Sequence, residues 1–167
     1  MKSLLLGGLF LVATTVVAAT DPQITGIAKN AQFKACLSTV SALEKFFGEG
    51  NNYGSWASWA TSQPDKQPFN VSMEITFSDG DQLVDFTVTP TPDGECSYVY
   101  TRTWFSPKSC IATSKEGFLN DAKYKTDLNK NIAAFEDGGT RVLLMPAGSG
   151  CVVQKKEVGF RHKKQGT

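Results

Sequence analysis

The sequence has little of what an enzyme requires. Its 167 residues include a single histidine, His162, within Arg161-His-Lys-Lys, where nothing nearby would orient an imidazole for proton transfer. Ser149 lies between two glycines, but the G-x-S-x-G pattern of a nucleophile elbow is absent. Glu74 and Asp85 are expected on the polar face of neighbouring strands, where acidic side chains are usually solvated. We therefore expect a protein without a catalytic residue, and a hydrolase using Glu74 and Asp85 is the third-ranked hypothesis.

Metal and cofactor signals are also lacking. The two closest cysteines, Cys96 and Cys110, are fourteen residues apart, which is not the close pairing of cysteine metal sites. Asp79 and Asp81 bracket a glycine as in parts of calcium loops, but the twelve-residue pattern and its final glutamate are missing. We expect no metal and no cofactor.

An excess of positive charge is missing as well. The chain has 17 basic and 16 acidic residues, a net charge of +1. Lys2 is the only charged residue before position 20, so residues 20–167 carry 16 of each sign. This balance argues against nucleic acid as a partner. From Lys155 onward there are five basic residues and one acid, a basic C-terminal tail that we interpret as solvated.

The only long apolar run is at the start of the chain. Residues 4–17 are uncharged and follow Lys2, and Val17-Ala18-Ala19 offers the small residues that signal peptidase reads. The run is too short for a membrane span, and a retained anchor is the alternative. We expect residues 1–19 to be a cleaved signal peptide and residues 20–167 to be one exported domain, periplasmic or secreted, without a membrane span.

The four cysteines all lie beyond the expected cleavage point, which indicates two disulfides. Four cysteines permit three pairings, and the sequence does not choose securely among them. Cys96 and Cys110 stand at opposite ends of an expected strand, too far apart to bond to each other. If the last hairpin brings Cys151 to the Cys96 end of that strand, Cys36 remains for Cys110. We take Cys36–Cys110 and Cys96–Cys151 as the expected pairs.

Hydrophobic periodicity predicts an α+β fold. Apolar residues recur at three- and four-residue steps over residues 24–47, which predicts a helix, and a second, less regular helical pattern falls near residues 121–135. Alternation predicts a three-stranded meander and a final hairpin, formed by residues 69–77, 83–89, 98–105, 141–145 and 151–158. The expected architecture is an N-terminal helix packed on an antiparallel sheet of about five strands. This layering resembles the cystatin-like and secretion-chaperone-like architectures.

Two groups of aromatic residues are candidate partner-binding residues. Tyr98, Tyr100, Arg102 and Trp104 alternate along one strand and therefore share one face. Tyrosine, tryptophan and arginine dominate binding hot spots, so an outward orientation would give a binding surface and an inward one a core. Trp56 and Trp59 are three residues apart, which would place them side by side on a helical turn, either sealing the core or exposed as anchors.

These features favour an exported, non-enzymatic protein that binds and blocks another protein. An inhibitor or an immunity protein against an envelope-targeting toxin or hydrolase is the concrete form of this hypothesis. The alternative is a carrier of a small molecule or lipid, with an aromatic pocket between helix and sheet. That pocket would be lined by Phe33, Phe47, Phe69, Phe77 and Phe86.

Overall fold

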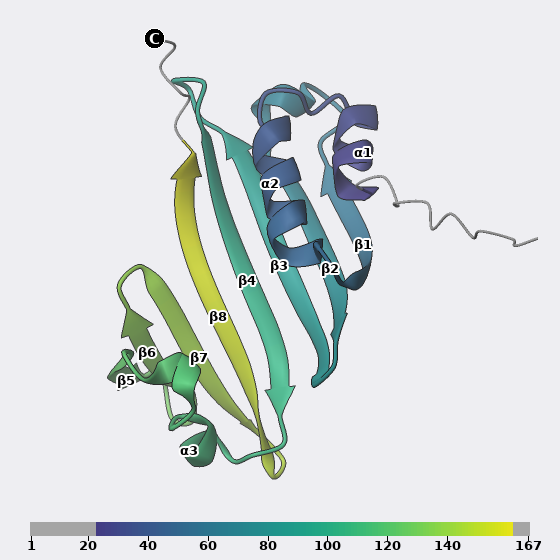
Figure 1. The fold of residues 1–167 in the computed structure, drawn as a ribbon. Coiled ribbons are helices and arrows are strands. Elements are labelled where there is room, and N and C mark those ends of the chain that lie inside the picture. Colours follow the sequence, from purple (N-terminus) through teal and green to yellow (C-terminus); the bar gives the residue numbers. More distant parts are fainter. Residues whose placement is uncertain (1–22, 162–167) are drawn as a thin grey trace, which may run out of the picture.

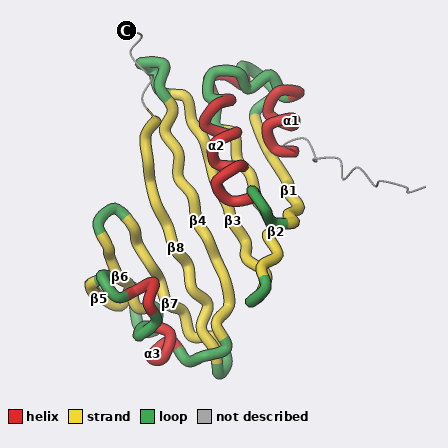
Figure 2. Tube along the Cα trace, viewed as in Figure 1, coloured by secondary structure: helices red, strands yellow, loops and turns green. Residues whose placement is uncertain are grey.

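The computed structural model describes residues 23–161, so the expected signal peptide and His162 lie outside the described residues. The fold has two layers, an antiparallel sheet of eight strands and a set of short helices on one of its faces (Figures 1 and 2). The sheet order is β1-β2-β3-β4-β8-β7-β6-β5. The strands are β1 (Asn52–Trp59), β2 (Phe69–Phe77), β3 (Gly80–Pro90), β4 (Cys96–Ser106), β5 (Lys123–Asp127), β6 (Ala133–Asp137), β7 (Thr140–Ala147) and β8 (Gly150–Arg161). The helices are α1 (Gln23–Asn30), α2 (Leu37–Gly48) and α3 (Cys110–Thr113), with 3₁₀ turns η1 (Pro64–Lys66) and η2 (Gly117–Leu119).

The α+β class, the antiparallel sheet and the presence of two disulfides are confirmed. The expected number of about five strands is wrong, because β1, β5 and β6 were not predicted. Residues 121–135 were expected to be helical, but β5 and β6 pair with each other and β6 pairs with β7. The three- and four-residue spacing of apolar residues there is overridden by these cross-strand pairings, including an edge-to-face contact between the rings of Tyr124 and Phe135.

The single long helix expected over residues 24–47 is interrupted. Gln32 has a φ of 59°, which ends α1, and the chain then inserts Phe33 fully into the core before α2 begins. The short helix α1 contacts β1, and α2 crosses β3 (Figure 1). None of the helices within residues 23–161 is long and apolar enough to cross a membrane.

The core is divided into two clusters on the helix side of the sheet. The larger lies under α1 and α2 and is built from the alternating residues of β2 and β3, which the sequence predicted. The smaller lies under α3 and η2 at the other end of the sheet. It contains Leu119, Val142, Leu144, Cys151 and Val153, with Trp104 and Phe135 packed against it.

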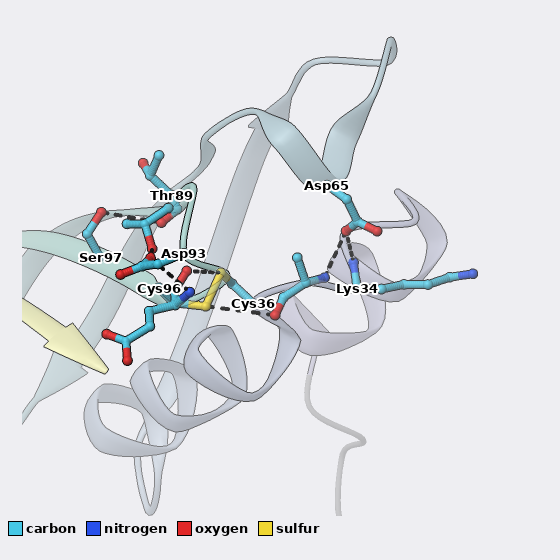
Figure 3. The surroundings of a disulfide bond; sticks show 10 residues. Lys34, Cys36, Asp65, Thr89, Asp93, Cys96 and Ser97 are labelled. Atoms are coloured by element: carbon cyan, nitrogen blue, oxygen red, sulfur yellow. Dashed lines mark hydrogen bonds between the residues drawn. A yellow bond between two sulfur atoms is a disulfide. The ribbon is translucent and has the colours of Figure 1, made fainter. Parts of the chain in front are cut away.

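Each disulfide belongs to one cluster, and the expected pairing is wrong. Cys36 bonds to Cys96, with Cα atoms 5.8 Å apart (Figure 3). Cys110 bonds to Cys151, with Cα atoms 4.9 Å apart. The reason is the direction of β8. It runs antiparallel to β4, so that Cys151 lies opposite Ser106, at the Cys110 end of β4. Two disulfides are compatible with an oxidising, extracellular compartment.

Near the first disulfide, the side chain of Asp65 holds the segment before α2, and two glutamines with a left-handed backbone lie beside this contact. The Asp65 carboxylate accepts hydrogen bonds from the backbone N–H groups of Lys34 and Ala35, the second at 2.8 Å (Figure 3). Gln32 and Gln63, with φ of 59° and 53°, flank this contact and line the same surface hollow. A left-handed conformation costs a residue with a Cβ atom about 1–2 kcal/mol.

We expect Gln32→Gly and Gln63→Gly each to raise the free energy of unfolding by about 0.5–1 kcal/mol, because glycine removes this strain at some cost in chain entropy. Thermal unfolding followed by circular dichroism checks this. The control is Gln67→Gly, since Gln67 has an ordinary φ of −121° and glycine there should destabilise. Shifts of the same sign in all three variants would contradict the strain argument.

Candidate functional site

The side chains of Tyr98, Tyr100, Arg102 and Trp104, here called the β4 ladder, face the helix side of the sheet. The register decides this, because Tyr100 lies opposite Phe86 and Arg102 lies opposite Val84, two core residues of β3. The outward alternative, with the ladder beside Glu74 and Asp85, is therefore not the arrangement in the structure. The outer face of β4 carries Val99, Thr101, Thr103 and Phe105 instead.

The tyrosine end of the ladder lies beside α2. Tyr100 is buried and packs edge-to-face on Phe47, with ring centroids 5.0 Å apart. The half-buried Tyr98 lies across Gly159 of β8, where an added Cβ atom would come within 2.4 Å of the phenol ring. A larger residue at position 159 would therefore require the Tyr98 ring to move.

A carboxylate closes the tyrosine end. Glu157 of β8 accepts hydrogen bonds from Tyr100 and from Thr140 Oγ1 (2.8 Å), and its Oε1 lies 3.3 Å from Lys155 Nζ. Burial raises the pKa of Glu157, but these three donors outweigh burial and hold it below its usual range. Burial and the hydrogen bond to Glu157 raise the pKa of Tyr100. The site therefore presents a fixed negative charge beside a neutral phenol.

Arg102 occupies the centre of the ladder. Its guanidinium carbon lies 5.2 Å from the centroid of the Phe77 ring and 5.8 Å from that of Trp104, within the range of cation–π attraction. Its Nε donates a hydrogen bond to Gln82 Oε1. No carboxylate of residues 23–161 forms an ion pair with Arg102. The guanidinium is held in place and its charge is not neutralised by a described residue.

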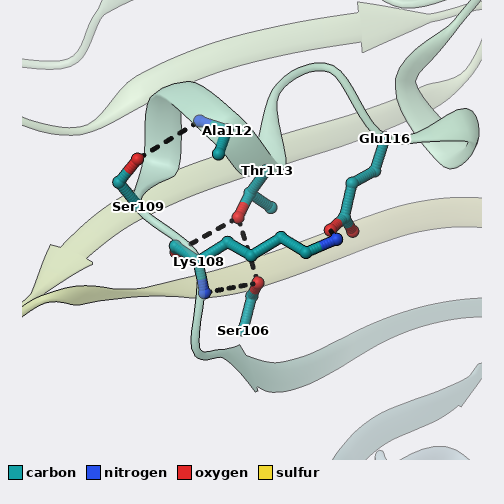
Figure 4. A network of polar contacts seen from close by, with 6 residues as sticks. All are labelled: Ser106, Lys108, Ser109, Ala112, Thr113 and Glu116. Atoms are coloured by element: carbon teal, nitrogen blue, oxygen red, sulfur yellow. Dashed lines mark hydrogen bonds and ion pairs between the residues drawn. The ribbon is translucent and has the colours of Figure 1, made fainter.

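The tryptophan end of the ladder lies beside the second cluster. The Trp104 ring packs edge-to-face on Phe118, with centroids 5.4 Å apart. Beyond it, Lys108 Nζ lies 2.9 Å from Glu116 Oε1, and Ser106 and Thr113 join through their hydroxyl groups at 3.1 Å (Figure 4). This polar network fixes the turn between β4 and α3.

Two hollows open along the ladder. The first, of about 320 Å³, lies between α2 and the strands β4 and β8, and its lining includes Phe46, Tyr98, Tyr100 and Glu157. The second, of about 290 Å³, lies between the β2–β3 turn and the segment after β4, and Gln82 and Trp104 line it. The β4 ladder therefore leads from one hollow to the other, with Arg102 between them. We call this surface the ladder groove.

Comparisons with protein-family models, with curated proteins and with solved structures find no match for this chain.

The two other tryptophan candidates are separated. Trp56 and Trp59, expected side by side on a helical turn, instead belong to strand β1, where a spacing of three residues places them on opposite faces. Trp59 pairs with Phe69 on the helix side and stacks on its ring, with centroids 6.1 Å apart. Trp56 pairs with Ser72 on the opposite face and is 82% exposed.

Sequence reasoning did not single out Phe46, Gln82 or Glu157 as site residues. Phe46 is 71% exposed at the rim of the first hollow, and an exposed phenylalanine off the apolar stripe of α2 was the signal that could have found it. Gln82 and Glu157 carry no such signal. They reach the groove because β3 and β8 flank β4, which only the sheet order reveals.

The groove brings together aromatic rings, the Arg102 guanidinium and the Glu157 carboxylate. Within residues 23–161, no group of three or more histidine, cysteine, aspartate or glutamate side chains is arranged to hold a metal ion. Glu74 and Asp85 lie on the opposite face, where Asp85 accepts a hydrogen bond from Ser72 Oγ at 2.5 Å. Aromatic rings, a fixed cation and a fixed carboxylate can together recognise a complementary polypeptide surface.

Proposed function

We propose that this protein is an exported, non-enzymatic binding protein that blocks another protein by docking it in the ladder groove. The observation that carries the proposal is Arg102, a guanidinium positioned by two rings and Gln82 and lacking a carboxylate partner among the described residues. A cation held in this way costs little further side-chain entropy when it binds. Its natural complement is an aspartate or glutamate side chain of the partner, bound through two parallel hydrogen bonds.

The surroundings of Arg102 favour a protein over a smaller ligand. Tyrosine, tryptophan and arginine are the residue types most enriched in binding hot spots, and here they alternate along one rigid strand. Phe46 adds an exposed ring at the rim of the groove. A partner loop with an acidic residue for Arg102 and an apolar side chain for the first hollow would complement both features.

The blocking role rests on the same features taken together with the expected signal peptide. The proposed protein is an exported domain that is stabilised by two disulfides, has a preformed groove and uses no catalytic residues. These properties suit an inhibitor or an immunity protein that acts on a toxin or hydrolase of the cell envelope. In this proposal the protein is periplasmic or secreted.

The carrier hypothesis has weaker support. Phe33, Phe69 and Phe86 are at most 1% exposed, and Phe33 stacks on Phe69 with centroids 5.2 Å apart, so these rings fill the core. The Phe77 ring packs against the Arg102 guanidinium. The first hollow, at about 320 Å³, is at the lower end of the range for ligand pockets.

The test compares binding of the wild-type protein and two groove variants to a partner captured from an envelope extract. Arg102→Gln removes the guanidinium and Phe46→Ala removes the rim ring. We expect each change to weaken binding by about 2 kcal/mol, or about 30-fold, as for hot-spot residues. Isothermal titration calorimetry with the purified partner measures the change.

Matched controls are available on the turn between β5 and β6. Lys130→Gln removes a positive charge and Leu128→Ala removes an apolar side chain, both from exposed positions away from the groove. Both controls should bind the partner as the wild type does. Wild-type affinity in both groove variants, or a loss of affinity in the controls, would refute docking in the ladder groove.

A further inference from the structure

The face of the sheet opposite the helices has no described element packed on it. Its central strands nevertheless carry exposed apolar side chains, namely Leu83, Phe105, Met145 and Val158. All four point to this face, because their cross-strand neighbours Thr103, Val152 and Val99 belong to the outward set of β4 and β8. Several large apolar side chains exposed on one face of a sheet are typical of a surface that another protein covers.

The charges on this open face are separated by side. On the β1–β4 side it carries Glu74 and Asp85. On the β8–β5 side it carries Lys156 and Arg141, together with Glu136, which lies opposite Arg141. The boundary between β4 and β8 divides the two sides and also divides the eight strands into two sets of four. Among these residues, the β1–β4 half of the face is therefore acidic and the β8–β5 half carries an excess of basic groups.

The register places these groups in common rows across the strands. Asp85 pairs with Thr101, Thr101 with Lys156, and Lys156 with Arg141, so the four residues form one row. The next outward-facing row contains Leu83, Thr103, Gln154 and Leu143 in the same strand order. Phe105 and Val152 are opposite each other in the row after that.

We propose that the open face binds a second copy of this chain about a two-fold axis that runs parallel to the strands, above the β4–β8 boundary. Such an axis places β4 of one copy over β8 of the other, and β3 over β7. Each row of one copy then lies over the same row of the other copy. Asp85 then faces Arg141 of the second copy, and Leu83 faces its Leu143. Phe105 faces Val152 in the same way, and each contact occurs twice, as in any isologous interface.

The charges select this orientation over the other in-plane axis. A two-fold axis perpendicular to the strands, through the same row, leaves each strand facing itself. It would place Asp85 over Asp85 and Lys156 over Lys156, and like charges in contact are strongly unfavourable. The axis parallel to the strands places Lys156 over Thr101 and joins the opposite charges. Charge complementarity therefore favours a second copy related by the axis parallel to the strands over one related by this perpendicular axis.

The geometry of two stacked sheets permits these contacts. Face-to-face sheets pack about 10 Å apart with their strands roughly aligned, a separation that long side chains such as arginine can bridge. The Arg141 side chain is 67% exposed, and its contact with Glu136 is 3.7 Å long and uses one nitrogen. The dimer leaves both ladder grooves on its outer surfaces, so it would present two identical partner sites.

The test is a charge exchange measured by sedimentation equilibrium on the purified, oxidised protein. Asp85→Arg places two arginines opposite each other and Arg141→Asp places two aspartates opposite each other. We expect each single variant to raise the dimer dissociation constant at least about tenfold, and the double variant D85R/R141D to restore it to within about threefold. Circular dichroism checks that each variant remains folded.

Glu74→Arg is the matched control, because Glu74 lies on the same face but would oppose Ala134 in the dimer, as the register of β2 and β6 shows. Its dissociation constant should stay close to that of the wild type. A wild-type protein that remains monomeric at about 1 mM would overturn the proposal and leave the face to a different protein. A dimer unaffected by the single exchanges, or not restored by the double exchange, would overturn it equally.

Discussion

Replacing Glu44 with alanine is expected to lower the free energy of unfolding by about 3–5 kcal/mol, the range found when one partner of a buried charged contact is removed. Glu44 is 3% exposed and lies in α2. Its carboxylate accepts hydrogen bonds from the backbone N–H groups of Ile24 (2.7 Å) and Thr25 (2.8 Å), from the Thr25 hydroxyl, and from the Tyr53 hydroxyl (2.7 Å). One side chain therefore joins α1, α2 and β1.

The large effect has two physical causes. The first N–H groups of a helix have no partner within the helix, and Glu44 supplies a buried acceptor for two of them. A carboxylate is also favoured at the positive end of the helix dipole. Alanine would leave these donors unsatisfied in the interior, and each unsatisfied donor costs about 1–3 kcal/mol. Urea denaturation of the variant measures the total loss.

Tyr53 gives a second readout of the same contact. Burial and the hydrogen bond to Glu44 raise the pKa of Tyr53 to about 12. Because this value lies above that of an unfolded tyrosine, the neutral phenol stabilises the fold below about pH 10, and this contribution is lost as the pH rises towards 12. In Glu44→Ala the tyrosinate absorbance should appear at lower pH than in the wild type.

Glu49→Ala is the matched control. Glu49 forms an exposed pair with Lys45 at 3.5 Å, and such pairs contribute about 0.3–0.5 kcal/mol. The loss of stability in Glu44→Gln should fall between those of Glu44→Ala and Glu49→Ala. Glutamine keeps one acceptor oxygen, but it places an NH₂ group among hydrogen-bond donors. A loss of less than about 1 kcal/mol for Glu44→Ala would contradict the stabilising role of the buried Glu44 carboxylate.

The parts of the fold that the sequence predicted are those with one buried and one wet face. β2 and β3 alternate apolar and polar residues, and their pairing matches the alternation. The strand β1 did not show this pattern, because glycine, alanine and serine occupy most of its positions beside the two tryptophans. All residues of β5 are exposed, so burial leaves no periodic signal in its sequence. Edge strands of this kind are specified by their neighbours.

The candidate site was predicted in composition but not in orientation. Alternation alone groups Tyr98, Tyr100, Arg102 and Trp104 on one face of a strand. Which face is covered depends on the register between β3 and β4, and shifting that register by one residue would reverse it. The partners of the ladder come from β2, β3 and β8, between 20 and 57 positions away in the sequence, so no local spacing could have identified Phe77, Gln82 or Glu157.

The disulfide pairing failed for a related reason. Placing the last hairpin beside β4 was correct, but the expected pairing also needed the start of β8 to lie next to the start of β4. In an antiparallel pair the start of one strand meets the end of the other. Cys151 therefore reaches Cys110, and Cys96 is left beside Cys36 at the beginning of α2.

Removing either disulfide is expected to cost about 4 kcal/mol, and the two losses should be nearly equal. The bonds join residues 60 and 41 positions apart. In the chain-entropy model the stabilisation grows only with the logarithm of the loop length, so both loops give about 4 kcal/mol. The double variants Cys36→Ala/Cys96→Ala and Cys110→Ala/Cys151→Ala test this by denaturant unfolding.

The two variants should differ in where the protein loosens. Cys36 and Cys96 belong to the cluster under α1 and α2, whereas Cys110 and Cys151 belong to the cluster under α3 and η2. Amide hydrogen exchange should therefore accelerate mainly in α1, α2 and β1 for the first variant, and mainly in β5, β6 and β7 for the second. Acceleration spread evenly over the whole sheet in both variants would show that the two clusters unfold as one unit. Reducing the wild-type protein removes both bonds at once. The two losses in free energy of unfolding are then expected to add, because the bonds lie in separate clusters.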